Sequence, residues 1–282
     1  MKLRKFLTAV INYFVFGNFF IAVCAVVMFL HTQIIFTLKI DKAFIPFVFF
    51  STLCSYSFHW YLTKHTNAVS SRLKWSASHK AFLISLFVVS FICTIIFFIP
   101  IIKYYRVLLP LAFVTFMYTA PKIPVQPFIF IKKIAVMKTT YLTLVWVFIT
   151  AVLPVLVSDS VWKYGNTLFV INRLFLIFPI CVLFDYRDRK EDMLEGIKNI
   201  STVLSVRGLD YVFGACMLLN FTSALLLYDL LESPFYSIAN LAPAFLLIIT
   251  YRISKSSKSD LWYYFYLDGL MMLSGLLILV LH

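Results

Sequence analysis

Apolar residues in this chain gather into nine runs of 17 to 25 residues, separated by shorter polar stretches. A helix of about 20 residues crosses the hydrocarbon core of a membrane, so each run is long enough, or nearly so, to do this. The runs are Phe6 to Leu30, Ala43 to Leu62, Ala81 to Ile99, Tyr104 to Ala120, Thr139 to Val157, Thr167 to Phe184, Tyr211 to Tyr228, Phe235 to Tyr251 and Leu261 to Leu281. The pattern predicts an all-α integral membrane protein, in which residues 1–282 form a single bundle of nine transmembrane helices.

The third and fourth runs are joined by a short link that begins at Pro100 and continues from Lys103 to Arg106. Proline removes a backbone donor and interrupts a helix. We therefore expect these two runs to form a helical hairpin with its turn outside the membrane.

Composition indicates the same class of protein. Hydrophobic residues make up 62% of the chain, 31 residues are Phe, 13% are charged and the mean hydropathy is +0.93. A soluble domain of this length could not bury so much apolar surface. The five cysteines lie inside the runs and form no C-x-x-C pair, so they are expected to be packing residues.

The 25 Lys and Arg residues are distributed unevenly around the runs. Nineteen lie at the N-terminus and in the linkers after runs two, four, six and eight, whereas five lie in the opposite linkers. Cytoplasmic loops are enriched in Lys and Arg, so this asymmetry predicts a cytoplasmic N-terminus, with the bacterial inner membrane as the expected location. The formal net charge of +13 is then a topology signal, and no nucleic-acid partner is expected.

The segment after the sixth run holds five of the chain's twelve acidic residues. If the helix continues past Phe184, then Asp185, Asp188, Asp192 and Glu195 lie on one face of it. A magnesium ion that carries a phosphate group would relieve the repulsion among them, because Mg²⁺ prefers hard oxygen ligands and keeps several water positions. The alternative is a solvated charge run beside basic residues.

Three linkers on the predicted cytoplasmic side are longer than a bundle needs, and together they could cap a cavity that opens inward. They are Thr63 to Lys80, Pro121 to Lys138 and Asp185 to Asp210. Lys132, Lys133 and Lys138 can face the acidic segment, and cations beside carboxylates and a metal form a site for an oligophosphate. Alternatively, these lysines extend to anionic lipid headgroups.

The pattern Asp185-x-x-Asp188-x-x-x-Asp192-x-x-x-Gly196 resembles the second aspartate-rich motif of the UbiA-type intramembrane prenyltransferases. The resemblance implies a nine-helix bundle with a cavity that faces the cytoplasm, and it implies that Asp185, Asp188 and Asp192 are catalytic residues that bind Mg²⁺. In that family, magnesium holds the diphosphate of an isoprenoid donor. The diphosphate leaves, and the allylic cation alkylates an electron-rich, lipophilic acceptor inside the lipid bilayer.

A second stretch, from Tyr118-Thr-Ala-Pro121 through Lys138 to Trp146 and Pro154, is similar to that family's linker and fifth helix. The similarity places Lys138 at the position of a lysine that contacts the diphosphate. Aromatic walls suit this chemistry, because ring faces stabilise a cation in a dry cavity.

The chain departs from the family where the first motif, N-D-x-x-D-x-x-x-D, would end the second helix. No acidic residue occurs between Asp41 and Asp159. The region instead contains His59, Lys64, His65 and Arg72. One interpretation is that His59 and Lys64 hold the diphosphate directly, with protonated imidazole adding charge. The other is that these bases pair with the surviving acids and that the protein no longer catalyses.

Two charged residues, Arg173 and Asp268, lie within apolar runs, where a charge usually has a partner. We expect a structural ion pair between them. Alternatively, Asp268 binds substrate by orienting an acceptor hydroxyl. Asn12 and Asn18 are expected to form hydrogen bonds between helices.

The sequence therefore favours transfer of a prenyl group from an isoprenoid diphosphate to a hydrophobic or aromatic acceptor, with Mg²⁺ as cofactor. A non-catalytic binder or carrier of prenyl lipid, built on a degenerate prenyltransferase scaffold, is the alternative. An ion transporter would need ionisable residues spread through the membrane, whereas this chain concentrates them on one side.

Overall fold

The computed structural model describes residues 2–63, 70–123, 138–194, 196–231 and 233–281. Every regular element among these residues is helical, which confirms the all-α prediction. The elements are α1 (Lys2–Phe16), α2 (Phe19–Ile35), α3 (Phe44–Leu62), α4 (Ser71–Ser78), α5 (Lys80–Phe98), η1 (Ile99–Tyr104), α6 (Tyr105–Thr119), η2 (Ala120–Lys122), α8 (Lys138–Val147), η4 (Phe148–Val152), α9 (Leu153–Leu156), α10 (Tyr164–Leu194), α11 (Ile200–Val203), α12 (Val206–Leu231), α13 (Pro234–Ser256), η5 (Trp262–Leu267) and α14 (Asp268–Leu281).

Within the described ranges, six helical segments are long and apolar enough to cross a membrane. One of them, Lys80–Lys122, contains both α5 and α6, which are separated at η1 where Ile101 leaves the helical conformation. The bent pair α1 and α2 forms a seventh candidate. These segments indicate a membrane-embedded protein.

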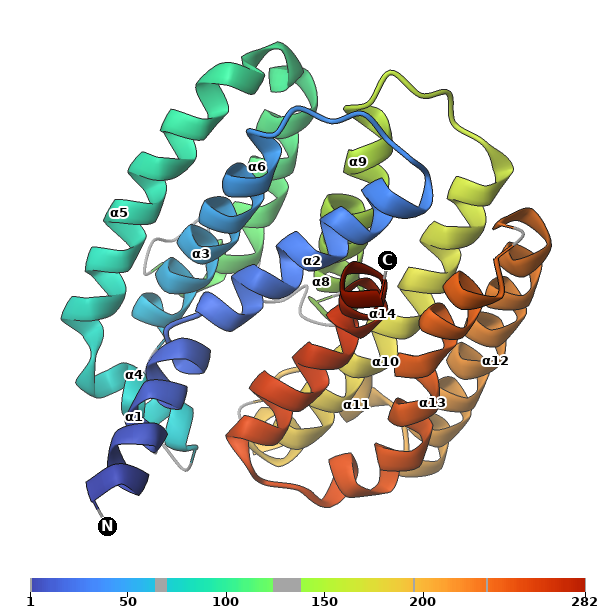
Figure 1. Cartoon of the computed structure of the whole chain (residues 1–282). Helices are drawn as coiled ribbons and strands as arrows, with labels where there is room; N and C mark the ends of the chain where they lie inside the picture. The colour runs from blue at the N-terminus through green and yellow to red at the C-terminus, as the bar shows by residue number, and fades with distance from the viewer. Residues whose placement is uncertain (1, 64–69, 124–137, 195, 232, 282) are drawn as a thin grey trace.

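The long helices form a ring in which neighbours in the chain are also neighbours in space. Helix α2 packs on α3, α6 lies against α3 and α8, α10 packs between α8 and α12, and α13 lies between α12 and α14. Contact between α14 and α2 closes the ring (Figure 1). The first and last long helices are therefore held together, and the fold forms one bundle.

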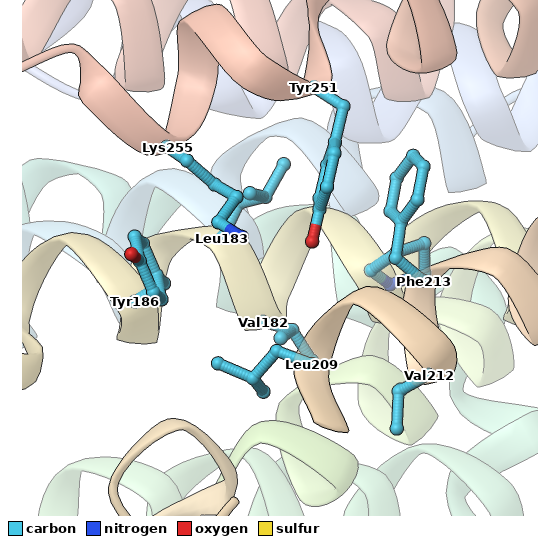
Figure 2. A pocket seen from close by; sticks show the side chains of 9 residues that line it. Val182, Leu183, Tyr186, Leu209, Val212, Phe213, Tyr251 and Lys255 are labelled. Carbon is cyan, nitrogen blue, oxygen red and sulfur yellow. The ribbon is translucent and has the colours of Figure 1, made fainter. Parts of the chain in front are cut away.

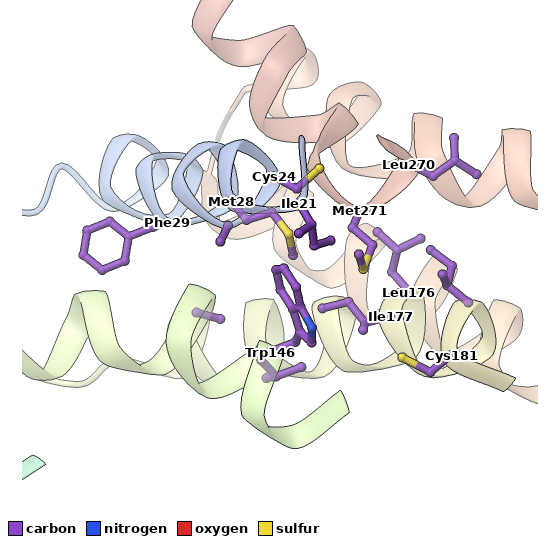
Figure 3. Close-up of a cluster of buried hydrophobic side chains, with 14 of the residues drawn as sticks. Ile21, Cys24, Met28, Phe29, Trp146, Leu176, Ile177, Cys181, Leu270 and Met271 are labelled. Atoms are coloured by element: carbon purple, nitrogen blue, oxygen red, sulfur yellow. The ribbon is translucent and has the colours of Figure 1, made fainter. Parts of the chain in front are cut away.

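The core lies where α2, α8, α10 and α14 meet. Figure 3 shows Trp146 of α8 close to Met28 of α2, with Ile177 of α10 and Met271 of α14 nearby. All four side chains are buried. The predicted packing role of the cysteines agrees with this core, since Cys24 and Cys181 belong to it and all five cysteines are free.

The first apolar run was predicted as one continuous helix, but the structure breaks it at Gly17 and Asn18 with a bend of 55°. Asn18 has a left-handed backbone (φ 68°), which Asn tolerates better than most residues. Its side-chain oxygen accepts a hydrogen bond from Arg72 at 2.6 Å, and its amide donates to Ser57 across the bundle. A second Arg72 nitrogen donates to the carbonyl of Val15 at the break. The expected hydrogen bonding of Asn18 between helices is thus confirmed.

The predicted ion pair between Arg173 and Asp268 is wrong. Arg173 instead donates to the carbonyls of Met28 (2.8 Å) and Thr150 (2.6 Å) and to His31 Nδ1 (2.7 Å). Thr150 lies in the π-helix η4, and Pro154 four residues later has no N–H to donate to its carbonyl. Arg173 therefore satisfies backbone groups that a membrane interior could not hydrate.

Candidate functional site

The C-terminal ends of α3, α6, α10 and α13 meet at one end of the bundle, together with α4 and α11, and we call this the polar end. Hydrogen bonds connect its parts: Lys122 after α6 contacts Thr63 after α3, and Arg187 of α10 contacts Asp260 after α13. The described portions of the three long linkers are thus gathered on one side, as the sequence predicted. The aspartates of α10, the lysines Lys122 and Lys138, and the polar end of a cavity described below all lie here.

Helix α10 continues past Phe184 to Leu194, so the predicted acidic face exists as far as the described residues reach; Glu195 lies outside them. Each of its three aspartates has a partner. Thr139 donates to Asp185 Oδ2, and Asn199 donates to Asp192 Oδ2 at 2.6 Å. Asn199 is itself fixed by the capping box that begins α11.

Asp188 is held differently, because Arg187 binds both of its oxygens at 2.7 and 3.0 Å. Arg187 also donates to Tyr264 Oη at 3.1 Å and lies 3.4 Å from Asp260 Oδ1. The side chain of Arg187 is 14% exposed and that of Asp188 is 45% exposed. Both oxygens of the carboxylate that was predicted to bind a metal therefore accept hydrogen bonds from Arg187.

Asp260 links α4 to Arg187 through hydrogen bonds. It is buried and accepts hydrogen bonds from the hydroxyls of Ser70 and Ser71 and from the backbone N–H of Arg72. Arg72 is also buried, and its guanidinium lies 4.1 Å from the ring centres of both Trp60 and Tyr264. Burial lowers the pKa of Arg72 to about 10, so it stays charged at neutral pH.

Lys138 begins α8, and its charge acts on Asp185, Asp188 and Asp192 without forming an ion pair in the described part of the chain. Its ammonium also lies 5.8 Å from the ring centre of Tyr118. The predicted proximity of Lys138 to the acidic segment is therefore observed. The other predicted lysines, Lys64, Lys132 and Lys133, lie outside the described residues.

A cation that the sequence analysis did not single out, Lys122, lies beside the end of α3, where the resemblance would place an acidic motif. Its Nζ is 2.7 Å from His59 Nε2 and 2.5 Å from Thr63 Oγ1. An ammonium group can only donate, so His59 Nε2 accepts, and Nδ1 carries the proton that faces Thr119 Oγ1 at 3.3 Å. His59 is therefore neutral in this arrangement, which contradicts the expectation that it adds positive charge.

A cavity of about 440 Å³ extends from this cluster into the apolar part of the bundle. Its walls come mainly from α3, α5, α6 and α8, and eight of the lining residues are aromatic: Phe47, Tyr56, Phe58, Phe87, Phe91, Phe116, Tyr118 and Trp146. His59, Tyr118 and Thr119 line it at the polar end. An apolar cavity of this size with a few polar groups at one end is typical of a small-molecule site.

Asp268, a predicted substrate-binding residue, does not line this cavity. It is buried at the start of α14, and its charge acts on Arg72 and Arg187. Its charge also acts on Tyr56, which does line the cavity.

A second hollow lies between α10, α12 and α13, where Lys255 and Tyr251 approach Tyr186 and Phe213 (Figure 2). Its volume is only about 10 Å³, room for no more than a water molecule. Lys255 is also paired with Asp210 at 2.6 Å. This hollow is therefore no candidate for an organic ligand.

The carboxylates offer an incomplete metal site. No group of three His, Cys, Asp or Glu side chains among the described residues is arranged to hold a metal ion. Asp185 and Asp192 each use Oδ2 in a hydrogen bond within the described chain, which leaves Oδ1 available. Mg²⁺ is commonly bound by one or two carboxylates together with substrate phosphates, so the donor set fits an ion that arrives with a phosphate ligand.

Comparison with known proteins identifies no relative, since no family model, curated protein or solved structure matches the chain. The function therefore has to be argued from the geometry of the site.

The two kinds of aspartate should respond differently to substitution. Asp185→Asn removes a free carboxylate oxygen and a charge, so we expect magnesium-dependent affinity for inorganic diphosphate to fall about tenfold or more. Asp188→Asn should change this affinity much less and should lower the melting temperature, because Arg187 loses its main partner. Calorimetric titration and thermal unfolding of the purified protein measure both. An equal loss of affinity in the two variants would contradict the structural role of Asp188.

Proposed function

We propose that this protein binds an isoprenoid diphosphate and transfers its prenyl group to a hydrophobic or aromatic acceptor within the membrane. One observation supports this most: an aromatic cavity of about 440 Å³ reaches His59, beside which lies Lys122, a lysine that forms no ion pair among the described residues. An isoprenoid diphosphate has the matching form, with a hydrocarbon chain and an anionic head. The resemblance of the acidic segment to the UbiA-type motif supports the same proposal.

In this proposal Lys122 and Lys138 bind the diphosphate from two sides of Tyr118. Both can donate charge-assisted hydrogen bonds to phosphate oxygens. His59 and Thr63 orient Lys122, and the ring of His59 stacks on Tyr118 at 5.1 Å. Tyr118 thus lies beside Lys138 and against the ring that contacts Lys122, and it lines the cavity.

The reaction breaks the bond between carbon 1 of the prenyl chain and the diphosphate oxygen, which keeps the electron pair. Lys122 and Lys138 stabilise the charge that develops on this oxygen. The aromatic walls stabilise the allylic cation and exclude water, which would otherwise capture it. The acceptor then forms the new bond to carbon 1 and releases a proton.

Magnesium is part of the proposal as a partner of the diphosphate. A bound Mg²⁺ would neutralise further charge on the leaving group. Asp185 and Asp192 are the residues proposed to hold it, through the oxygens that Thr139 and Asn199 leave free.

The alternative, a non-catalytic carrier of prenyl lipid, is favoured by one specific observation. Arg187 holds Asp188, and Lys122, His59 and Thr63 lie where the UbiA-type family has its first acidic motif. A protein that lost metal ligands in this way could keep the cavity and abandon transfer.

We further propose nine membrane crossings, with the polar end in the cytoplasm of a bacterial cell. The Lys and Arg asymmetry supports this orientation, and the separation of α5 from α6 at η1 supports two crossings in Lys80–Lys122. Single cysteines at the exposed positions Ala77 and Lys198 should then react with an impermeant reagent from the cytoplasmic side. A cysteine at exposed Ser160 should react from the other side. Labelling of Ala77→Cys and Lys198→Cys from opposite sides would contradict the proposal.

Substitution of Lys122 tests the function directly. Lys122→Met keeps an unbranched side chain one atom shorter and removes its charge, so the affinity for farnesyl diphosphate should fall about tenfold or more. Lys255→Met is the matched control, because Lys255 lies at the same end but pairs with Asp210 outside the cavity. The Lys255→Met variant should bind farnesyl diphosphate with the affinity of the wild type.

Release of inorganic diphosphate separates the two functions. With magnesium, farnesyl diphosphate and a membrane lipid extract, a transferase releases diphosphate and forms a prenylated product detectable by mass spectrometry. A carrier binds the ligand without release. If the wild type binds no prenyl diphosphate and retains only neutral prenyl lipid, transfer is ruled out.

A further inference from the structure

The cavity is elongated, and its length can be measured along the helices that line it. On α3 the lining residues run from Phe47 to His59, and on α6 from Leu108 to Thr119. At a rise of about 1.5 Å per residue, these stretches span about 18 Å and about 16 Å. Two independent helices therefore give nearly the same length from the polar end to the far end.

Aromatic side chains cluster at the far end, around Phe47. Phe44 is fully buried and lies next to Phe47 (6.4 Å between ring centres), Phe29 (6.1 Å) and Tyr104 (5.3 Å). Phe47 also contacts Phe98 at 6.2 Å. We call these five residues the aromatic floor.

A hydrogen bond between helices holds the aromatic floor in place at the end of the bundle away from the polar end. The hydroxyl of Tyr104 donates to the carbonyl of Val157 at 2.8 Å, which joins the start of α6 to the end of α9. Phe47 is the floor residue that faces the cavity. The floor can therefore act as a fixed stop for a chain that enters from the polar end.

The side walls offer little polar contact to such a chain. The hydroxyls of Ser51, Thr94 and Thr115 each donate to a carbonyl of their own helix. Their methyl and methylene groups, together with the aromatic rings, are left to face the cavity. These walls suit a hydrocarbon chain rather than a polar one.

We infer that the cavity selects isoprenoid diphosphates of three to four isoprene units, farnesyl to geranylgeranyl, and that Phe47 sets this limit. An extended isoprene unit of four main-chain carbons is about 5 Å long, given carbon–carbon bonds of about 1.5 Å. About 18 Å therefore holds three to four units above the aromatic floor. The inference rests on the proposed function, because that function supplies the diphosphate head of the ligand. The limit on the length of the prenyl chain follows from the position of the aromatic floor.

The test is a series of competition measurements with prenyl diphosphates of two, three, four, six and eight units, in one detergent. For the wild type, affinity should rise at least about tenfold from two units to the optimum at three or four, because each added unit buries more apolar surface. It should fall by a similar factor at six and eight units. Phe47→Ala should move the optimum at least one unit longer, and Phe47→Trp should move it shorter.

Phe91→Ala is the matched control, since Phe91 belongs to the α5 wall and not to the aromatic floor. It should leave the optimum unchanged. Comparing optima between variants removes the effect of ligand partition into detergent, which is the same for all of them. Two Phe47 variants with opposite expected shifts also separate a change of cavity length from general damage to the fold.

The outcomes distinguish this inference from the proposed function. If prenyl diphosphates bind in a Lys122-dependent manner but the optimum is the same in the wild type and both Phe47 variants, the length limit is wrong and the proposed function stands. If no prenyl diphosphate of any length binds, both are wrong. Shifts of the optimum in the two expected directions would support both.

Discussion

Hydrocarbon surroundings impose one constraint on this bundle: a buried polar group must find its partner inside the protein. The breaks in the helices show how the constraint is met. Where η4 and Pro154 disturb a helix, Arg173 donates to the carbonyl of Thr150. Where α1 and α2 separate, Arg72 donates to Val15 and Asn18. In both places a guanidinium with several donors supplies hydrogen bonds to the chain at the break.

The same constraint applies to the charged residues beside the cavity. Arg187 is balanced by Asp188 and Asp260, whereas the contacts of Lys122 in the described chain are neutral: His59, Thr63 and the ring of Trp60. A partly buried cation without a carboxylate is costly unless an anion completes it. A diphosphate at the polar end would supply that anion, while its hydrocarbon chain filled the aromatic cavity. Binding would then relieve an electrostatic cost already present in the fold.

Hydrophobic runs predicted the helices well because long apolar segments can satisfy their backbone groups only as helices in a membrane. The continuation of α10 past Phe184 could likewise be read from the spacing of its acidic residues. The break at Gly17 and Asn18 could not, since it depends on Arg72 from a distant segment. Arg173 was wrongly paired with Asp268 because a sequence shows charged residues but not carbonyls freed by a π-helix.

Lys122 was missed for a similar reason. In the sequence it is one of four lysines in a linker, and only the fold places it beside His59 and Thr63. The signal that was available is its position directly after Pro121, which keeps it close to the end of α6. Because the ammonium group of Lys122 donates to His59 Nε2, the imidazole of His59 is neutral and does not add the positive charge that its residue type suggested.

The most direct test of this account is photo-crosslinking with farnesyl diphosphate that carries a photoreactive group on its last isoprene unit. With the diphosphate at the polar end, the label should be found by mass spectrometry on Phe47 or Leu108, at the far end of the cavity. Excess unlabelled farnesyl diphosphate should compete it away. Label found only on outward-facing residues such as Phe113 or Val89, and not displaced by competitor, would contradict the account.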